Sequence, residues 1–251
     1  MSTTTAVTAA ATPAISRSGH PPGSPFRQAV RDLTSVLAPL EKRCLIWMAE
    51  RMPASINSDH LTGLALAAMV GAGASYWLAR ATPLGLPLAI VCLALNWFGD
   101  SLDGTLARVR QQQRPRYGFY VDHVVDALGA LCLVGGLGLS GYMSPAVAAA
   151  LLITYFLLCI EVFLATHTRG TFTMSFFKIG PTELRILLSI GSLVLLVRST
   201  STIFGHTFLL FDVGGAIGAA GLLVTFFVSA IRNTRALYLA EPTPPRPGIS
   251  R

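Results

Sequence analysis

The stretch DSLDGTLARVRQQQRPRYGFYVDHVVD, residues 100–126, decides how this chain folds and where its chemistry lies. It holds four aspartates and stands between two apolar segments, LPLAIVCLALNWF (86–98) and ALGALCLVGGLGL (127–139). A carboxylate at membrane depth costs roughly 2.5–3.5 kcal/mol, so a group of four indicates a functional site. Divalent cations would keep these carboxylates ionised, because hard cations prefer oxygen ligands. The stretch therefore predicts a carboxylate metal site that holds a phosphate or diphosphate at a membrane surface.

The composition of the 251 residues is that of a membrane protein. The chain is 52% hydrophobic and only 12% charged, whereas soluble domains carry about 25% charged residues. The four cysteines are widely spaced and form no CxxC pair, so neither disulfides nor a cysteine metal site is expected. A net charge of +7 could suit nucleic acid, but the position of the charges matters more than their total, and no nucleic-acid partner is expected.

Six apolar stretches are long enough to cross roughly 30 Å of hydrocarbon. We therefore expect an all-α, polytopic membrane protein with six transmembrane helices, in which the second and third helices carry the aspartates at their ends. The spans are expected near residues 60–80, 84–108, 118–140, 145–167, 184–201 and 207–231.

Lysine and arginine residues gather on one side of these spans. All 19 except Arg80 and Arg198 fall in the termini, in the loops 109–117 and 168–183, or at the adjoining helix ends. The positive-inside rule then puts both termini and the aspartates at the cytoplasmic face. We expect an integral multi-pass protein of a bacterial plasma (inner) membrane, whose basic face attracts anionic lipids and phosphate-bearing substrates.

One membrane domain, residues 27–235, is expected between two tails. Residues 1–26 are rich in Ser, Thr, Ala, Pro and Gly and predict a disordered cytoplasmic tail, and residues 236–251 predict a Pro-rich cytoplasmic one. Within residues 27–52, apolar side chains recur at helical spacing among charges. This pattern predicts an N-terminal amphipathic helix on the membrane interface, with a simple surface linker as the alternative.

Two consecutive helices can each present two of the aspartates on one face. The face on the first helix covers roughly 140° of arc, and its members are Asp100, Asp103, Gly104, Ala107 and Arg108. On the next helix Gly118, Asp122 and Asp126 recur every four residues and share a face. A short loop makes these helices antiparallel neighbours, so four carboxylates can hold two divalent ions about 3.5–4 Å apart.

The other residues on these faces suit a bulky phosphate ligand. Gly104 and Ala107 leave room beside the carboxylates, and the Arg108 guanidinium can donate two hydrogen bonds to phosphate oxygens. A hydrogen bond between helices would explain a lone aspartate in a span, but it does not explain four of them beside Gly and Arg.

The sequence resembles the signature of the CDP-alcohol phosphatidyltransferase family through the pattern Asp100-x2-Asp103-Gly104-x2-Ala107-Arg108-x9-Gly118-x3-Asp122-x3-Asp126. All eight defining positions are present, and the nine-residue gap lies in a polar loop, where length changes are tolerated. The resemblance implies transfer of a substituted phosphate from a CDP-linked donor, expected to be CDP-diacylglycerol, to a hydroxyl acceptor with release of CMP. It also implies a homodimer in the lipid bilayer.

The same resemblance implies a role for each signature residue. Asp100, Asp103 and Asp122 would hold two Mg²⁺ or Mn²⁺ ions. Asp126 would act as the general base on the acceptor hydroxyl and could also bind a metal. The nucleotide side would be lined by Gly104, Ala107, Arg108 and Gly118.

A segment before the first span departs from the pattern of many relatives. Ser58 and Asp59 stand where those relatives carry a Pro-Asn pair near the nucleotide, while the following Leu61 and Thr62 match. Asp59 could contact the nucleotide, and it could equally be the N-cap of the first span.

The string GPTE at residues 180–183 resembles one in some family members, including choline and ethanolamine phosphotransferases. Lys178 and Arg185 could contact an anionic acceptor, and Glu183 could contact a cationic one. The same residues also fit a helix start led by Pro181, with Glu183 in the first turn.

Three other functions use similar chemistry. A choline- or ethanolamine-type enzyme, which transfers from a CDP-alcohol to diacylglycerol, needs the same site. An intramembrane prenyltransferase also holds a diphosphate with Asp-rich helix ends and Mg²⁺, but it usually has more spans and lacks the DG-x2-AR spacing. A membrane cation transporter would need partner charges deeper in the spans, and most of the spans have none.

Overall fold

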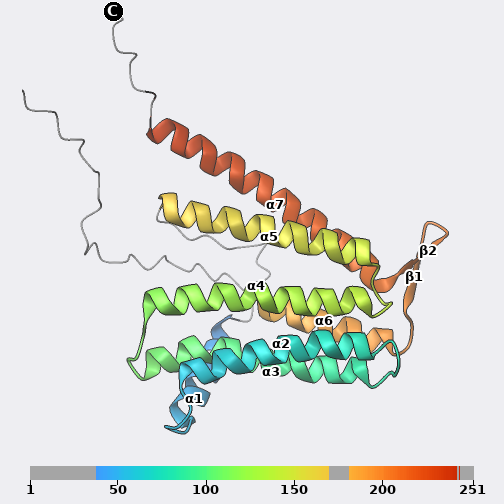
Figure 1. Cartoon of the computed structure of the whole chain (residues 1–251), viewed down its shortest axis with the longest axis horizontal. Coiled ribbons are helices and arrows are strands. Elements are labelled where there is room, and N and C mark those ends of the chain that lie inside the picture. Colours follow the sequence, from blue (N-terminus) through green and yellow to red (C-terminus); the bar gives the residue numbers. More distant parts are fainter. Residues whose placement is uncertain (1–37, 170–180, 242, 244–251) are drawn as a thin grey trace, which may run out of the picture.

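The computed structural model describes residues 38–169, 181–241 and 243, and these are almost wholly helical. Figure 1 shows α2 to α5 running alongside one another, with α7 inclined over α5. In the described residues the helices are α1 (Ala38–Arg51), α2 (Ser58–Leu78), α3 (Gly85–Val109), α4 (Pro115–Leu139), α5 (Pro145–Arg169), α6 (Pro181–Leu195) and α7 (Leu210–Ala240). The strands β1 (Thr200–Ile203) and β2 (His206–Leu209) form a hairpin between α6 and α7.

Five helices of the described chain are long and apolar enough to cross a membrane, namely α2, α3, α4, α5 and α7. They indicate an integral membrane protein, as the hydropathy pattern predicted. The fifth expected span, over residues 184–201, is not confirmed, because α6 has only 15 residues. At about 1.5 Å per residue it is shorter than the roughly 30 Å of a hydrocarbon core.

The structure agrees with a mainly helical membrane fold, and the short β-hairpin corrects the span expected over 184–201. The helix ends at Leu195, and Thr200 already pairs with Leu209 in the hairpin. The segment TSTI that forms β1 is rich in β-branched residues, which favour strands. Phe204 and Gly205 have φ angles of 50° and 81°, as the tight two-residue turn of a hairpin requires. The last span therefore begins at Leu210 instead of 207.

The centre of the bundle is α2, which packs against both α3 and α4. Its side chains Ala72 and Tyr76 are fully buried, as is Ala89 on α3. At the crossing of α2 with α4, a Cβ atom built on Gly136 would lie 2.0 Å from the carbonyl oxygen of Gly73. Small residues allow this close approach of two backbones, and the crossing lies toward the C-terminal ends of α2 and α4.

The short helix α1 packs beneath those polar ends (Figure 1). Its Leu45 and Ala49 are buried in a cluster with Leu102 and Leu106 of α3. The Arg110 guanidinium, just after α3, donates to backbone carbonyls that follow α1. A helix thus exists within the predicted segment 27–52, whereas its placement on a membrane interface stays a prediction.

Most of the predicted tails lie outside the described residues, and so do residues 27–37 of the predicted amphipathic helix. At the other end, α7 continues to Ala240, past the predicted start of the C-terminal tail at residue 236. The apolar and helix-forming sequence RALYLA extends the helix there.

Candidate active site

Three of the four signature aspartates form one group between α3 and α4. A carboxylate oxygen from each of Asp100, Asp122 and Asp126 lies within 4.8 Å of the others. Asp100 and Asp122 are half-buried and Asp126 is exposed. Oxygen ligands at this spacing, half shielded from water, suit Mg²⁺ or Mn²⁺. The helices α3 and α4 are held side by side by α2, which packs against both of them, and this arrangement brings together three of the four aspartates that the sequence predicted to meet.

The fourth aspartate, Asp103, lies outside this group. Its Oδ2 atom accepts a hydrogen bond of 2.6 Å from the hydroxyl of Thr62 on α2, and its Oδ1 atom accepts one from the Gly104 amide. The Ser58 hydroxyl donates to the backbone carbonyl of Asp103 at 2.9 Å. Asp103 is therefore tied to the start of α2, and its role as a metal ligand stays a prediction.

Within this group, Asp100 has a contact with Arg185 that the sequence did not reveal. Arg185 on α6 donates from Nη2 to Oδ2 of Asp100 at 2.5 Å, and from Nε to the amide oxygen of Asn96 at 2.7 Å. The sequence offers Arg185 as a candidate contact for an anionic acceptor, with a helix start as the alternative. The partner was missed because Asp100 and Arg185 are 85 residues apart.

The small signature residues leave open space beside the aspartates, as predicted. A Cβ atom built on Gly118 would meet nothing within 4 Å, and one on Gly104 would meet only the Arg108 guanidinium, at 3.4 Å or more. The exposed Arg108 donates to the hydroxyl of Thr105 at 2.9 Å. This side of α3 and α4 can therefore admit a bulky ligand without displacing the backbone.

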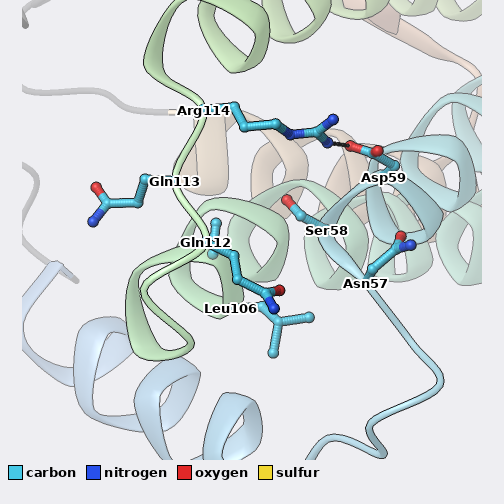
Figure 2. Close-up of a pocket in the computed structure, with 8 residues that line it drawn as sticks. Asn57, Ser58, Asp59, Leu106, Gln112, Gln113 and Arg114 are labelled. Carbon is cyan, nitrogen blue, oxygen red and sulfur yellow. Dashed lines mark hydrogen bonds and ion pairs between the residues drawn. The ribbon is translucent and has the colours of Figure 1, made fainter.

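A pocket of about 470 Å³ opens next to these residues, between the start of α2, the end of α3 and the loop that leads to α4. Figure 2 shows Asp59 and Arg114 pointing toward one another across it, joined by an ion pair. This contact raises the pKa of Arg114, because the carboxylate of Asp59 favours the charged guanidinium. The pocket is lined by Asn57, Ser58, Asp59, Leu106, Ala107, Gln112, Gln113 and Arg114.

Two helix starts decide between alternatives that the sequence left open. Asn57, not Asp59, caps α2, because its side chain accepts from the backbone N–H of His60 at 2.9 Å. The helix-start interpretation of GPTE is confirmed, since α6 begins at Pro181 with Glu183 in its first turn. Lys178 lies outside the described residues.

Comparison with known proteins identifies the family of this chain. The family model described as CDP-alcohol phosphatidyltransferase matches residues 57–227, which is more than half of the chain. No curated protein matches the chain. The matched region runs from the cap of α2 into α7 and includes all eight signature positions. Members of this family are phosphotransferases that transfer substituted phosphate groups. The chain therefore belongs to the CDP-alcohol phosphatidyltransferase family.

Proposed function

We propose that this enzyme transfers a phosphatidyl group from CDP-diacylglycerol to a soluble hydroxyl acceptor and releases CMP. Family membership makes it a phosphotransferase for substituted phosphate groups. The observation that carries the proposal is the gathering of Asp100, Asp122 and Asp126 between two membrane helices. A diphosphate attached to a bilayer lipid can reach such a site while its acyl chains stay among the apolar helices.

The carboxylates would hold two Mg²⁺ or Mn²⁺ ions. Asp100, Asp122 and Asp126 supply oxygen ligands from one group, and Asp103 keeps further lone pairs beside its hydrogen bond from Thr62. When bound, the ions stabilise negative charge on the diphosphate and on the leaving CMP. The Arg108 guanidinium adds hydrogen-bond donors for the same oxygens.

Asp126 is the general base in this proposal. It is exposed, whereas Asp100 and Asp122 are half-buried, so it is the most accessible of the three to an incoming acceptor. Its carboxylate takes the hydroxyl proton as the acceptor oxygen attacks the phosphorus of the phosphatidyl group. The new P–O bond forms while the bond to the CMP oxygen breaks, and CMP leaves with the electron pair.

We infer that the nucleotide occupies the pocket at the start of α2. Ala107 of the signature lines that pocket, and the hydrogen bond from Ser58 to Asp103 connects its wall with the aspartates. Asp59, Gln112 and Arg114 offer both acceptors and donors for the edge of a base. Its volume of about 470 Å³ lies within the usual range of roughly 300–1,000 Å³ for ligand sites.

The proposed enzyme is a homodimer in a bacterial plasma membrane, with both termini and the site at the cytoplasmic face. In this proposal α6 makes the fifth of six crossings, because a bilayer can thin around a helix that is shorter than its hydrocarbon core. The distribution of Lys and Arg supports this orientation. Single cysteines introduced at Gln112 and at Arg80 would be labelled from opposite sides of intact cells. Labelling of both from the same side would contradict the proposed orientation.

The function is tested by CMP release from the purified protein in lipid nanodiscs with CDP-diacylglycerol and Mg²⁺ or Mn²⁺. The acceptor panel holds serine, inositol, inositol phosphate and glycerol phosphate, with Asp126→Asn as the control. We expect release that depends on one acceptor and is lost in the variant. Release only from CDP-choline or CDP-ethanolamine with diacylglycerol would overturn the proposed donor, and no release from either pairing would overturn the reaction.

A further inference from the structure

We propose that Arg185 is a positioning residue, which together with Asn96 fixes the carboxylate of Asp100 for metal binding. The inference rests on the proposed function, in which Asp100 is a metal ligand. Arg185 comes from α6, outside the eight-residue signature, and its side chain is only 15% exposed. Its contact with Asp100 is therefore well shielded from water, unlike a surface ion pair.

The guanidinium of Arg185 spans two residues that lie one helical turn apart on α3. Nη2 donates to Oδ2 of Asp100 at 2.5 Å, while Nε donates to Oδ1 of Asn96 at 2.7 Å. The planar fork of an arginine can make both bonds with one fixed orientation. Because one oxygen of Asp100 is held in this way, the rotation of its carboxylate is restricted, and the other oxygen stays available to a metal.

Asn96 is itself held in place from its other end. It is 5% exposed, and its amide nitrogen donates to the backbone carbonyl of Ala65 on α2 at 3.0 Å. A buried amide that uses both its oxygen and its nitrogen has a single favourable orientation. The backbone of α2 thus orients Asn96, Asn96 orients Arg185, and Arg185 orients Asp100.

The start of α6 is anchored one turn before Arg185. The Thr182 hydroxyl donates to Oε1 of Glu41 on α1 at 2.9 Å, and the indole N–H of Trp97 on α3 donates to the same oxygen at 2.8 Å. Glu41 therefore joins α1, α3 and α6. Arg185 is fixed both by its own helix and by its two side-chain partners, as a positioning role requires.

The experiment measures Mn²⁺ binding to the full-length protein in nanodiscs, from the electron paramagnetic resonance signal of free Mn²⁺, together with kcat and the KM for the acceptor. The variants are Arg185→Gln, Arg185→Lys and Asp100→Asn. The matched control is Arg80→Gln, which removes an equal charge from an exposed residue beyond the far end of α2. Thermal unfolding checks that each variant is folded.

We expect Arg185→Gln to weaken Mn²⁺ binding about 10- to 100-fold, the usual effect of losing a partner of a metal ligand. Arg185→Lys should lie between this variant and the native protein, because an ammonium can contact Asp100 but cannot also span to Asn96. The kcat should fall while the KM for the acceptor stays unchanged. If Arg185→Gln does not fold, Arg185→Lys carries the same comparison.

Unchanged or tighter Mn²⁺ binding in Arg185→Gln, when Asp100→Asn weakens it, would overturn the positioning role and leave the metal role of Asp100 in place. A raised KM for the acceptor with native Mn²⁺ affinity would overturn it too, by making Arg185 an acceptor contact. If Asp100→Asn itself leaves Mn²⁺ binding unchanged, the proposed metal role of Asp100 is wrong.

Discussion

Glycines are tightly packed where α2 crosses α4, and they face open space at the proposed active site on α3 and α4. At the crossing, Cβ atoms built on Gly73 and Gly136 would lie 2.1 Å and 2.0 Å from backbone carbonyl oxygens. At the site, a Cβ atom on Gly118 would meet nothing within 4 Å, although Gly118 and Gly136 belong to the same helix. The same residue type therefore serves close helix packing in one region and space for a ligand in the other.

Because of this difference, substitutions at two places on α4 are expected to have different effects, one on stability and the other on activity. Substitutions at the crossing must move one backbone away from another, so their effect falls on folding. A methyl group at Gly118 of the site meets no protein atoms within 4 Å, so its effect falls on the substrate. Four changes test this separation.

The largest effect is expected at the site. Asp126→Asn keeps the shape of the side chain but removes the proposed general base, so the transfer rate should fall about 10²- to 10⁴-fold. Because Asp126 is exposed, the unfolding temperature should stay at the native value. On the same sample, CMP release measures the transfer rate and thermal unfolding measures the stability. A large loss of stability would show that the site aspartates also support the fold.

The next effect is expected at the crossing of α2 with α4. Gly136→Ala would bring a Cβ atom against the backbone of Gly73, and overpacking of this kind costs about 1–3 kcal/mol of unfolding free energy. Thermal unfolding in nanodiscs should show a clearly lower midpoint.

Its matched control is the neighbouring residue. A Cβ atom on Gly135 meets nothing within 4 Å, so Gly135→Ala should leave the midpoint unchanged or slightly higher. Equal midpoints for the two variants would contradict the tight packing of this crossing.

A smaller and opposite effect is expected for Gly118→Ala. The folded protein has room for the methyl group, and alanine is favoured over glycine in a helix by about 0.8–1.0 kcal/mol. The midpoint should therefore stay the same or rise, while kcat/KM for the CDP-linked donor falls. Gly214→Ala on α7, which also meets no atoms within 4 Å, should leave kcat/KM unchanged. Native kcat/KM in Gly118→Ala would place the ligand elsewhere.

The smallest effect is expected at the rim of the pocket. The side chains of Asp59 and Arg114 are 45% and 53% exposed, and exposed ion pairs contribute little to stability. Asp59→Asn should leave the unfolding midpoint unchanged and raise the KM for the CDP-linked donor, because the carboxylate lines the proposed nucleotide pocket. Arg114→Gln, which removes the other partner of the same ion pair, is measured beside it. A native KM in both variants would exclude this rim from nucleotide binding.

Hydropathy predicted the helices α2 to α5 and α7 well, since each span is a property of one continuous segment. The segment after α6 was predicted wrongly, because hydropathy is averaged over a window of residues. Averaged over 184–201 it is apolar, yet Thr200 at its end already begins a strand, and Ile203 and Gly205 just beyond it favour the rest of the hairpin. An average over a window conceals such local preferences, so the hairpin between α6 and α7 was missed.

The sequence alone determined the membrane class, the family signature and the helix face on which each aspartate lies. These follow from hydropathy and from the spacing of residues along each helix. The meeting of Asp100 with Asp122 and Asp126 depended on tertiary packing, because α2 packs against both α3 and α4. Only the tertiary structure decided that Asp103 accepts from Thr62 and that Arg185 holds Asp100, across 41 and 85 residues of chain. Helical periodicity orients a side chain about its own axis, but the packing of other helices selects the partner that it meets.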